Sequence, residues 1–167
     1  VHEGRISAAS GLAGVPSSCE VLGVQRGIEL ARETRGRIHF THLSAARSLE
    51  LVRAAKAEGL EVTCDVTPHH LVFCEEDVMA SGYDGYFKVN PPLRSEADRE
   101  ALWAGLADGT VDAVATDHAP WHEDEKDLSF QEAAFGIASL ECAAAGVLDG
   151  AVRRGVPLER VLGAFTS

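Results

Sequence analysis

The sequence predicts an α/β fold built on a parallel sheet. Segments with helical periodicity alternate with short apolar runs, as expected of parallel strands joined by crossover helices. Polar residues stand where three of these runs end, at His42, Asp65 and Asp117. The C-terminal ends of the strands of a closed (β/α)8 TIM barrel carry its reactive groups, so this coincidence favours a barrel. An open, flavodoxin-like sheet places ligands at the same ends, so the pattern by itself leaves both architectures open.

The helices are predicted from apolar residues that recur every three or four positions, with Gly36 and Gly59 at the ends of the first two. They cover residues 20–35, 75–80, 95–106 and 129–148, and one more follows Pro157. The second helix follows a polar turn that begins at Ser44 and ends before Gly59, with the apolar stripe Leu49, Leu51, Val52 and Ala55. Residues 1–18 are rich in Gly, Ser and Ala, which predicts a loop, with Ser17 or Ser18 as the helix cap.

The predicted strands cover residues 37–43, 60–66 and 111–116, with a short extended segment at 86–90. Three strands are few for an independent fold. We therefore expect one domain or a piece of one. Met79 is the only methionine, so a chain that is processed, trimmed or incomplete is expected.

Composition limits the classes of function. A chain of 167 residues with 46% hydrophobic and 25% charged residues is typical of a globular protein. The net charge of -11 and the pI near 5.0 disfavour nucleic acid and anionic membranes as partners. No run approaches the roughly 20 apolar residues of a membrane span, and the start does not resemble a signal peptide, which favours a cytoplasmic protein.

The four cysteines form no CxxC pair, which argues against a zinc ribbon or a disulfide scaffold. We expect them to be small buried hydrophobic residues. They are Cys19, Cys64, Cys74 and Cys142.

His42 and Asp117 are the candidates for metal chemistry. Strand alternation would place His42 on the same face as Phe40, and an imidazole at a barrel mouth suits Zn2+ or a similar divalent ion. His39, of opposite parity, is expected to face the helices. Asp117 directly follows an apolar strand, where a carboxylate can bind a metal and accept a proton from water. The alternatives are a hydrogen-bonded core histidine and a capping or turn aspartate.

Other polar residues have weaker signals. His69, His70 and Asp65 are interpreted as hydrogen-bonding support for a metal site, although exposed loop histidines would give the same pattern. Asn90 and Arg94 could present an amide and a guanidinium to a substrate carboxylate, or belong to a simple turn and helix start. The charged run at 122–126 is typical of a solvated loop. The sequence contains no Gly-rich phosphate loop, GxSxG elbow or HExxH helix.

Taken together, seven short motifs in one order make the chain resemble the C-terminal part of the dihydroorotases of the amidohydrolase superfamily, which are also similar to hydantoinases. The motifs are Val1-His2-Glu3-Gly4, His39-Phe40-Thr41-His42-Leu43-Ser44, Val62-Thr63-Cys64-Asp65-Val66-Thr67-Pro68-His69-His70-Leu71, Asn90-Pro91-Pro92-Leu93-Arg94, Thr116-Asp117-His118-Ala119-Pro120, Glu125-Lys126 and Phe135-Gly136-Ile137.

The resemblance implies a metal-dependent (β/α)8 TIM barrel with one or two divalent ions such as Zn2+. It also implies that residues 1–167 are the C-terminal portion of a single barrel domain whose N-terminal strands lie outside this chain. It implies the reversible interconversion of N-carbamoyl-L-aspartate and L-dihydroorotate in pyrimidine biosynthesis. His42 and Asp117 match metal ligands, and Asp117 also matches the general base and acid. Asn90, Phe135 and Gly136 match substrate-binding positions, the last two through their backbone.

Two departures from the family pattern stand out. Trp121 occupies a position where the family usually has a histidine that helps hold substrate, so either His122 takes that role or substrate binding is weakened. The family's His-x-His pair, its bridging carboxylated lysine or aspartate and a further metal histidine all precede Val1. Because catalytic zinc usually has at least three protein ligands, we expect this segment by itself to bind metal weakly and to be inactive.

Two alternatives to a catalytic dihydroorotase remain open. The chain could be a hydantoinase or dihydropyrimidinase relative, or a non-catalytic dihydroorotase-like subunit that supports aspartate transcarbamoylase. Either a homo-oligomer or a complex with that enzyme would fit the family. A self-sufficient small α/β binding module is disfavoured, because its strand edges would be exposed.

Overall fold

A parallel sheet with the strand order β1-β2-β3 forms the centre of the computed structural model, which describes residues 1–166. The strands are β1 (Ile38–Phe40), β2 (Val62–Val66) and β3 (Ala113–Val114). Ile38 is opposite Val62 on one side of β2, and Asp65 is opposite Ala113 on the other. The predicted α/β class and parallel pairing are confirmed. Each paired strand is shorter than its apolar run, and the C-terminal ends of all three meet at one edge.

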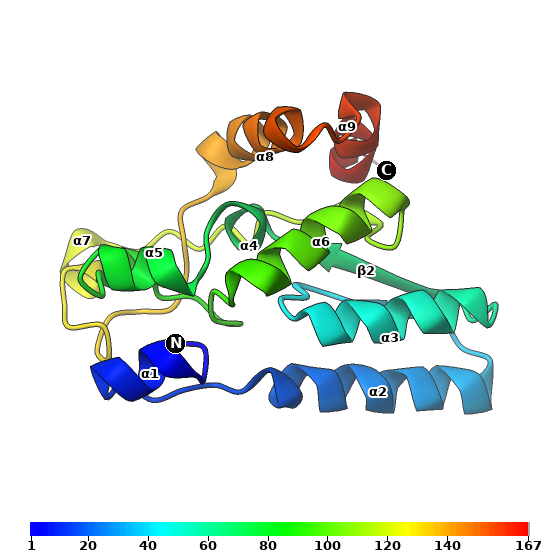
Figure 1. Cartoon of the computed structure of the whole chain (residues 1–167), viewed down its shortest axis with the longest axis horizontal. Coiled ribbons are helices and arrows are strands. Elements are labelled where there is room, and N and C mark those ends of the chain that lie inside the picture. Colours follow the sequence, from blue (N-terminus) through cyan, green and yellow to red (C-terminus); the bar gives the residue numbers. More distant parts are fainter. Residues whose placement is uncertain (167) are drawn as a thin grey trace.

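Helices pack against one side of this sheet, and Figure 1 shows α2, α3 and α6 lying in a row with α8 and α9 beyond them. The bounds are α1 (Arg5–Ser10), α2 (Ser17–Thr34), α3 (Ala46–Ala57), α4 (Pro68–Val72), α5 (Glu75–Ala80), the 3-10 helix η1 (Gly85–Phe87), α6 (Glu96–Asp108), α7 (Glu123–Lys126), α8 (Leu140–Arg154) and α9 (Leu158–Thr166). None of these helices is both long and apolar enough to cross a membrane.

The main core lies between the sheet and the helices. Alternate β2 residues Val62, Cys64 and Val66 are buried there among the apolar faces of the helices. Helix α2 approaches β1 so closely that a Cβ on Gly27 would lie 2.6 Å from the Phe40 ring. A glycine is therefore required where this helix crosses the strand.

The opposite face of the sheet is polar. His39 lies on this face, where its ring contacts Thr63 and Asp65, and it is largely exposed. The prediction that His39 faces the helices is wrong, because Phe40 takes the helix-facing position beside Gly27.

Several predicted elements differ from the structure. Residues 1–18 include α1, the cap position of α2 is Pro16 rather than a serine, and residues 86–90 contain no strand. The helix predicted at 129–148 begins only at Leu140, because the chain bends through Gly136, whose φ is 136°. The charged run at 122–126 contains the short helix α7 instead of being only a solvated loop.

Two of the four cysteines depart from the expected burial. Cys64 and Cys74 are buried, as predicted. Cys19 in α2 and Cys142 in α8 are exposed, because they lie on helix faces turned away from the core.

A second apolar cluster lies beside the main core. It contains Val78, Val89 and Leu93, with partly buried residues from the N-terminus and the segment before α8 packed around them. Arg94 at its border is 3% exposed and donates to Ser44 Oγ and the Val15 carbonyl. Its guanidinium thus joins three parts of the chain. Arg94 is therefore neither the surface residue at a helix start nor the residue free to bind a substrate carboxylate that the sequence predicted.

Candidate active site

His42 and Asp117 meet where β1 and β3 end. Each adopts a left-handed backbone conformation, with φ of 57° and 46°, although neither is glycine. Strained conformations of this kind cost free energy and cluster at functional sites. His42 Nδ1 lies 3.7 Å from Asp117 Oδ1, and both side chains are partly accessible, at 24% and 29%. The bend at His42 ends the strand alternation, so His42 does not share a face with Phe40 as predicted.

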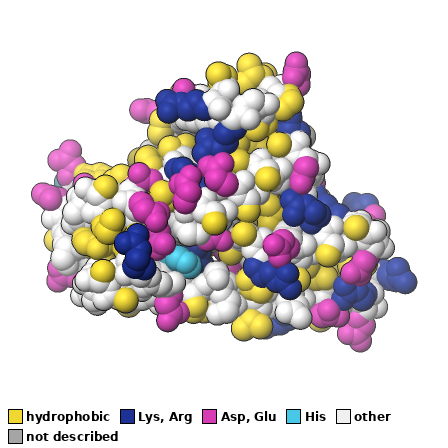
Figure 2. All heavy atoms as spheres, viewed as in Figure 1, with side chains coloured by type: hydrophobic (Ala, Val, Ile, Leu, Met, Phe, Trp, Pro, Cys, Tyr) yellow, Lys and Arg dark blue, Asp and Glu magenta, His cyan; other side chains and the backbone are white. Residues whose placement is uncertain are grey.

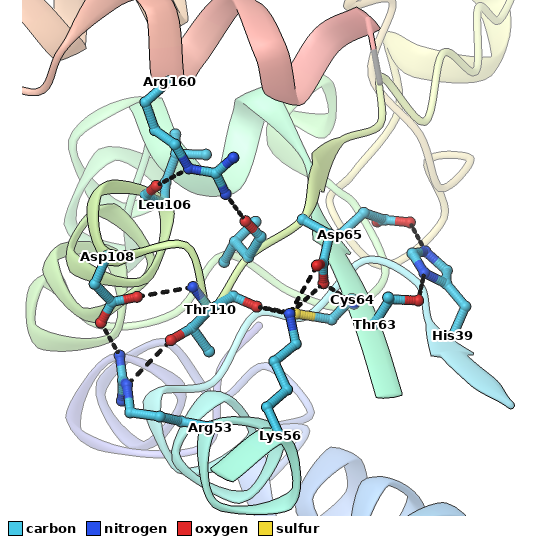
Figure 3. A network of polar contacts seen from close by, with 12 residues as sticks. His39, Arg53, Lys56, Thr63, Cys64, Asp65, Leu106, Asp108, Thr110 and Arg160 are labelled. Atoms are coloured by element: carbon cyan, nitrogen blue, oxygen red, sulfur yellow. Dashed lines mark hydrogen bonds and ion pairs between the residues drawn. The ribbon is translucent and has the colours of Figure 1, made fainter. Parts of the chain in front are cut away.

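Asp65 supports this pair from the end of β2. Its carboxylate is buried and accepts hydrogen bonds from the backbone amide of His42 at 2.6 Å, from Thr41 Oγ1 at 2.8 Å and from His39 Nε2 at 2.8 Å. Figure 3 shows the His39 ring between Thr63 and Asp65. The bond to the His42 amide directly holds the bend that turns the His42 ring toward Asp117, so the expected supporting position of Asp65 is present.

His70 lies on α4 and is fully bonded. Its Nε2 lies 3.0 Å from the Pro91 carbonyl, which can only accept, so Nε2 carries the proton and Nδ1 accepts from Thr67 Oγ1 at 2.7 Å. Burial lowers the pKa of His70 to about 4. His70 is thus a neutral structural residue that ties α4 to the Asn90-Pro91 segment.

His69 differs from its neighbour. It is 2% exposed, and neither ring nitrogen has a hydrogen-bond partner within residues 1–166. Burial, together with the nearby His70 and His42, lowers the pKa of His69 to about 2. Neither histidine is an exposed loop residue, so that alternative is wrong.

The residues present fit a divalent ion only in part. Within residues 1–166 no cluster of three or more His, Cys, Asp or Glu side chains is arranged to hold a metal. His42 and Asp117 nevertheless supply an imidazole and a carboxylate from two strand ends, which are donor types that Zn2+ accepts. These two side chains are fewer than the three protein ligands that catalytic zinc usually has.

The predicted substrate residues lie around two neighbouring cavities. Asn90 and Phe135 line a largely apolar cavity of about 450 Å³, whose wall also includes Lys88. Gly136 and Trp121 line a second cavity of about 290 Å³. Neither cavity is lined by His42 or Asp117, although Ala119 in the loop after Asp117 lines the second.

His122 does not join these residues. Its side chain is 73% exposed and caps α7 by accepting a hydrogen bond from the Asp124 amide at 3.3 Å. Trp121 instead reaches the predicted substrate segment and donates its indole N–H to the Phe135 carbonyl at 2.8 Å. Sequence spacing could not show this contact, because it joins residues on either side of α7.

Charged side chains of both signs are spread over the visible surface of the protein (Figure 2). On the face in Figure 2, acidic and basic side chains are interspersed with apolar ones and do not gather into one basic area. This distribution is consistent with the net charge of -11.

Solved structures define the class of protein that this fold resembles. The L-hydantoinase (dihydropyrimidinase) from Arthrobacter aurescens matches with a TM-score of 0.80 and 29% identity, over 87% of this chain and 33% of that chain. The dihydropyrimidinase from Brevibacillus agri matches in fold with a TM-score of 0.84 and 22% identity, over 96% of this chain and 38% of that chain. The fold is that of part of a hydantoinase-type enzyme.

Curated sequences narrow the relationship further. The chain is 49% identical over 164 residues to the dihydroorotase of Pelotomaculum thermopropionicum, and 51% identical over 162 residues to that of Anaeromyxobacter dehalogenans. Each match covers 97% of this chain but only 38% and 37% of the relative, so the chain spans less than two fifths of the curated relatives that it matches. No protein-family model matches. The chain is a homologue of a segment of the dihydroorotases, and the predicted resemblance is confirmed.

Proposed function

We propose that this chain contributes part of the active site of a metal-dependent cyclic amide hydrolase that interconverts L-dihydroorotate and N-carbamoyl-L-aspartate. The observation that carries the proposal is the approach of His42 Nδ1 to within 3.7 Å of Asp117 Oδ1 at the ends of two strands. The homology to dihydroorotases over 97% of the chain supports the choice of substrate.

The proposed fold of the whole protein is a (β/α)8 barrel. Both β1 and β3 are edge strands within the described residues, and unpaired edges normally require cover. The polar face of the sheet borders a hollow of about 680 Å³ lined in part by His39, Thr63 and Arg160. Further strands beside β1 and β3 would cover the edges and enclose this hollow.

His42 and Asp117 would hold one divalent ion together with ligands from the rest of the protein. Zn2+, when bound, supplies a Lewis acid that polarises the amide carbonyl and makes water more acidic. Asp117 is the residue of this chain that accepts a proton from the attacking water and delivers it to the leaving ring nitrogen. Its partial exposure, 29%, leaves the carboxylate accessible to both groups. Asp65 keeps His42 in place throughout.

The test compares the wild-type full-length protein that contains this chain with its Asp117→Asn variant. We expect dihydroorotate hydrolysis to fall by about 10²–10⁴-fold, the range typical of a lost general acid-base. Unchanged turnover in the variant would rule out the role of Asp117. Hydrolysis of hydantoin or dihydrouracil in preference to dihydroorotate would favour the hydantoinase alternative, which the similarity to the Arthrobacter aurescens enzyme supports.

A wild type without turnover that copurifies with aspartate transcarbamoylase would indicate the non-catalytic subunit. Assay of the 167-residue chain by itself tests whether it is inactive, as we propose from its two metal ligands. Measurable hydrolysis by this chain would contradict that expectation.

A further inference from the structure

The segment 134–137 is hydrogen-bonded to the loop that follows Asp117. The Ala119 amide donates to the Ile137 carbonyl at 3.1 Å, and His118 pairs with Ile137 in a parallel bridge. A Cβ on Gly136 would lie 2.5 Å from the Ala119 side chain, so only glycine permits this approach. The position of the segment is therefore tied to the strand end that carries Asp117.

Lys126 holds the same segment from the interior of the protein. Its side chain is 3% exposed, and Nζ donates to the carbonyls of Ala134 at 2.8 Å and Gly136 at 2.9 Å. No carboxylate lies within ion-pair distance of this ammonium group among the described residues. Burial lowers its pKa, and Lys88 lowers it further. Two carbonyls of the segment are thus bonded to a buried cation.

Trp121 engages the carbonyl between those two. Its Nε1–H donates to Phe135 O at 2.8 Å, and Trp121 also lines the cavity of about 290 Å³ together with Gly136. With Ile137 bonded to Ala119, all four carbonyls from Ala134 to Ile137 have donors. The Phe135 amide, by contrast, donates to no acceptor within residues 1–166.

We propose that Trp121 biases ligand specificity at this site: its indole N–H competes with any ligand N–H for the Phe135 carbonyl, whereas the Phe135 N–H remains able to donate. The site then favours a ligand that presents an acceptor oxygen, such as a carbonyl or carboxylate oxygen. A ring N–H is disfavoured, because it would have to share the Phe135 carbonyl with the indole. The inference rests on the proposed function, since it takes the ligand to be a cyclic amide bound beside Asp117.

The experiment uses the full-length protein and the variant Trp121→Phe, which keeps an aromatic ring but removes the N–H. Dissociation constants are measured calorimetrically for dihydroorotate and for its N1-methyl and N3-methyl derivatives. Freeing the Phe135 carbonyl lets it accept from a ring N–H, which is worth about a fivefold change in affinity. For each protein we compare the dissociation constant of a methyl derivative with that of dihydroorotate. For one methyl derivative, this ratio should be about fivefold larger in the variant than in the wild type.

The matched control is Tyr86→Phe. Tyr86 is a half-exposed residue that lines the same cavity of about 290 Å³, and this substitution also removes one donor. The control should leave the ratio between dihydroorotate and its methyl derivatives at the wild-type value. An equal ratio in the wild type and Trp121→Phe would overturn the proposal while leaving the proposed function intact.

A second measurement does not depend on ligand binding. Hydrogen exchange of the Trp121 indole N–H, followed by NMR, should be at least about fivefold slower than in a free indole if the bond to Phe135 persists in solution. Unprotected exchange overturns the proposal whether or not dihydroorotate binds. Absence of dihydroorotate binding in every protein, with a protected indole, instead overturns the proposed function and the specificity role that rests on it.

Discussion

Replacing Asp65 by alanine should loosen His42 and destabilise the protein. The change removes the acceptor of three hydrogen bonds, from the His42 amide and from the side chains of Thr41 and His39. A hydrogen bond to a charged group contributes about 1.5–3 kcal/mol, but His39 is 45% exposed and its contact is screened by water. We therefore expect the free energy of unfolding to fall by about 2–4 kcal/mol.

The loss should also act locally. Without its acceptor, His42 has less reason to remain at a φ of 57°, which is an unfavourable conformation for a residue other than glycine. The His42 amide should exchange with solvent faster, and the affinity of the full-length protein for Zn2+ should fall, because the imidazole is no longer held toward Asp117. Tenfold to hundredfold losses of metal affinity are typical when a supporting partner is removed.

Asp112→Ala is the matched control. Asp112 also accepts from a backbone amide, that of Cys64 at 2.8 Å, and is bonded to Lys56, but it precedes β3 and lies away from His42. Urea denaturation should show destabilisation in both variants, whereas only Asp65→Ala should change His42 exchange and Zn2+ affinity. Similar effects of the two variants at His42, or a loss below about 0.5 kcal/mol for Asp65→Ala, would refute the positioning role.

Three further predictions concern packing, pH and the buried lysine. Gly27→Ala should destabilise the protein by about 1–2 kcal/mol, because crowding against the Phe40 ring of β1 outweighs the gain in helix propensity. Gly23→Ala in the same helix meets no atom within 4 Å and should stabilise the protein by up to about 1 kcal/mol. Thermal unfolding distinguishes the two variants, and equal effects would contradict the close packing at Gly27. The pKa of His70 falls from 6.5 to about 4 on burial, so its contribution to stability is complete above pH 6.5 and is lost as the pH falls toward 4. Urea denaturation at several pH values should show that the free energy of unfolding decreases over this range, and that His70→Gln reduces the decrease. An unaltered pH dependence in the variant would argue against a neutral buried ring. Lys126→Met should cost about 2–3 kcal/mol and speed amide exchange at 134–137, since two carbonyls lose their donor; a variant as stable as the wild type would show that those bonds contribute little.

Much of the fold followed from local patterns. The helix at Glu75–Ala80 lies where its acidic, apolar-striped segment predicted it, and α2, α3 and α6 lie within a few residues of their predicted bounds. The segment before α8 did not follow, because its path depends on Gly136 packing against Ala119 and on a buried lysine from α7. Such contacts join residues that local periodicity treats separately.

The candidate site shows the same division. Residue type and position at strand ends sufficed to single out His42, Asp65 and Asp117, because parallel strands bring their C-terminal ends together. The direction of each side chain depended on tertiary contacts. Strand alternation misplaced His39 and His42, since it cannot anticipate a left-handed bend held by a carboxylate on the neighbouring strand.

The sequence by itself thus determined the α/β class, the alternation of the three strands with the longer helices, the resemblance to dihydroorotases and the residues that could bind a metal. Only the tertiary structure decided that Trp121 donates to the Phe135 carbonyl, that Lys126 is buried beneath the same segment and that the buried His69 ring has no hydrogen-bond partner among residues 1–166. Residue type and periodicity set which groups a strand or helix presents. The hydrogen-bond partner of each group depends on which distant segments pack beside it, and the three-dimensional arrangement of the chain supplies that information.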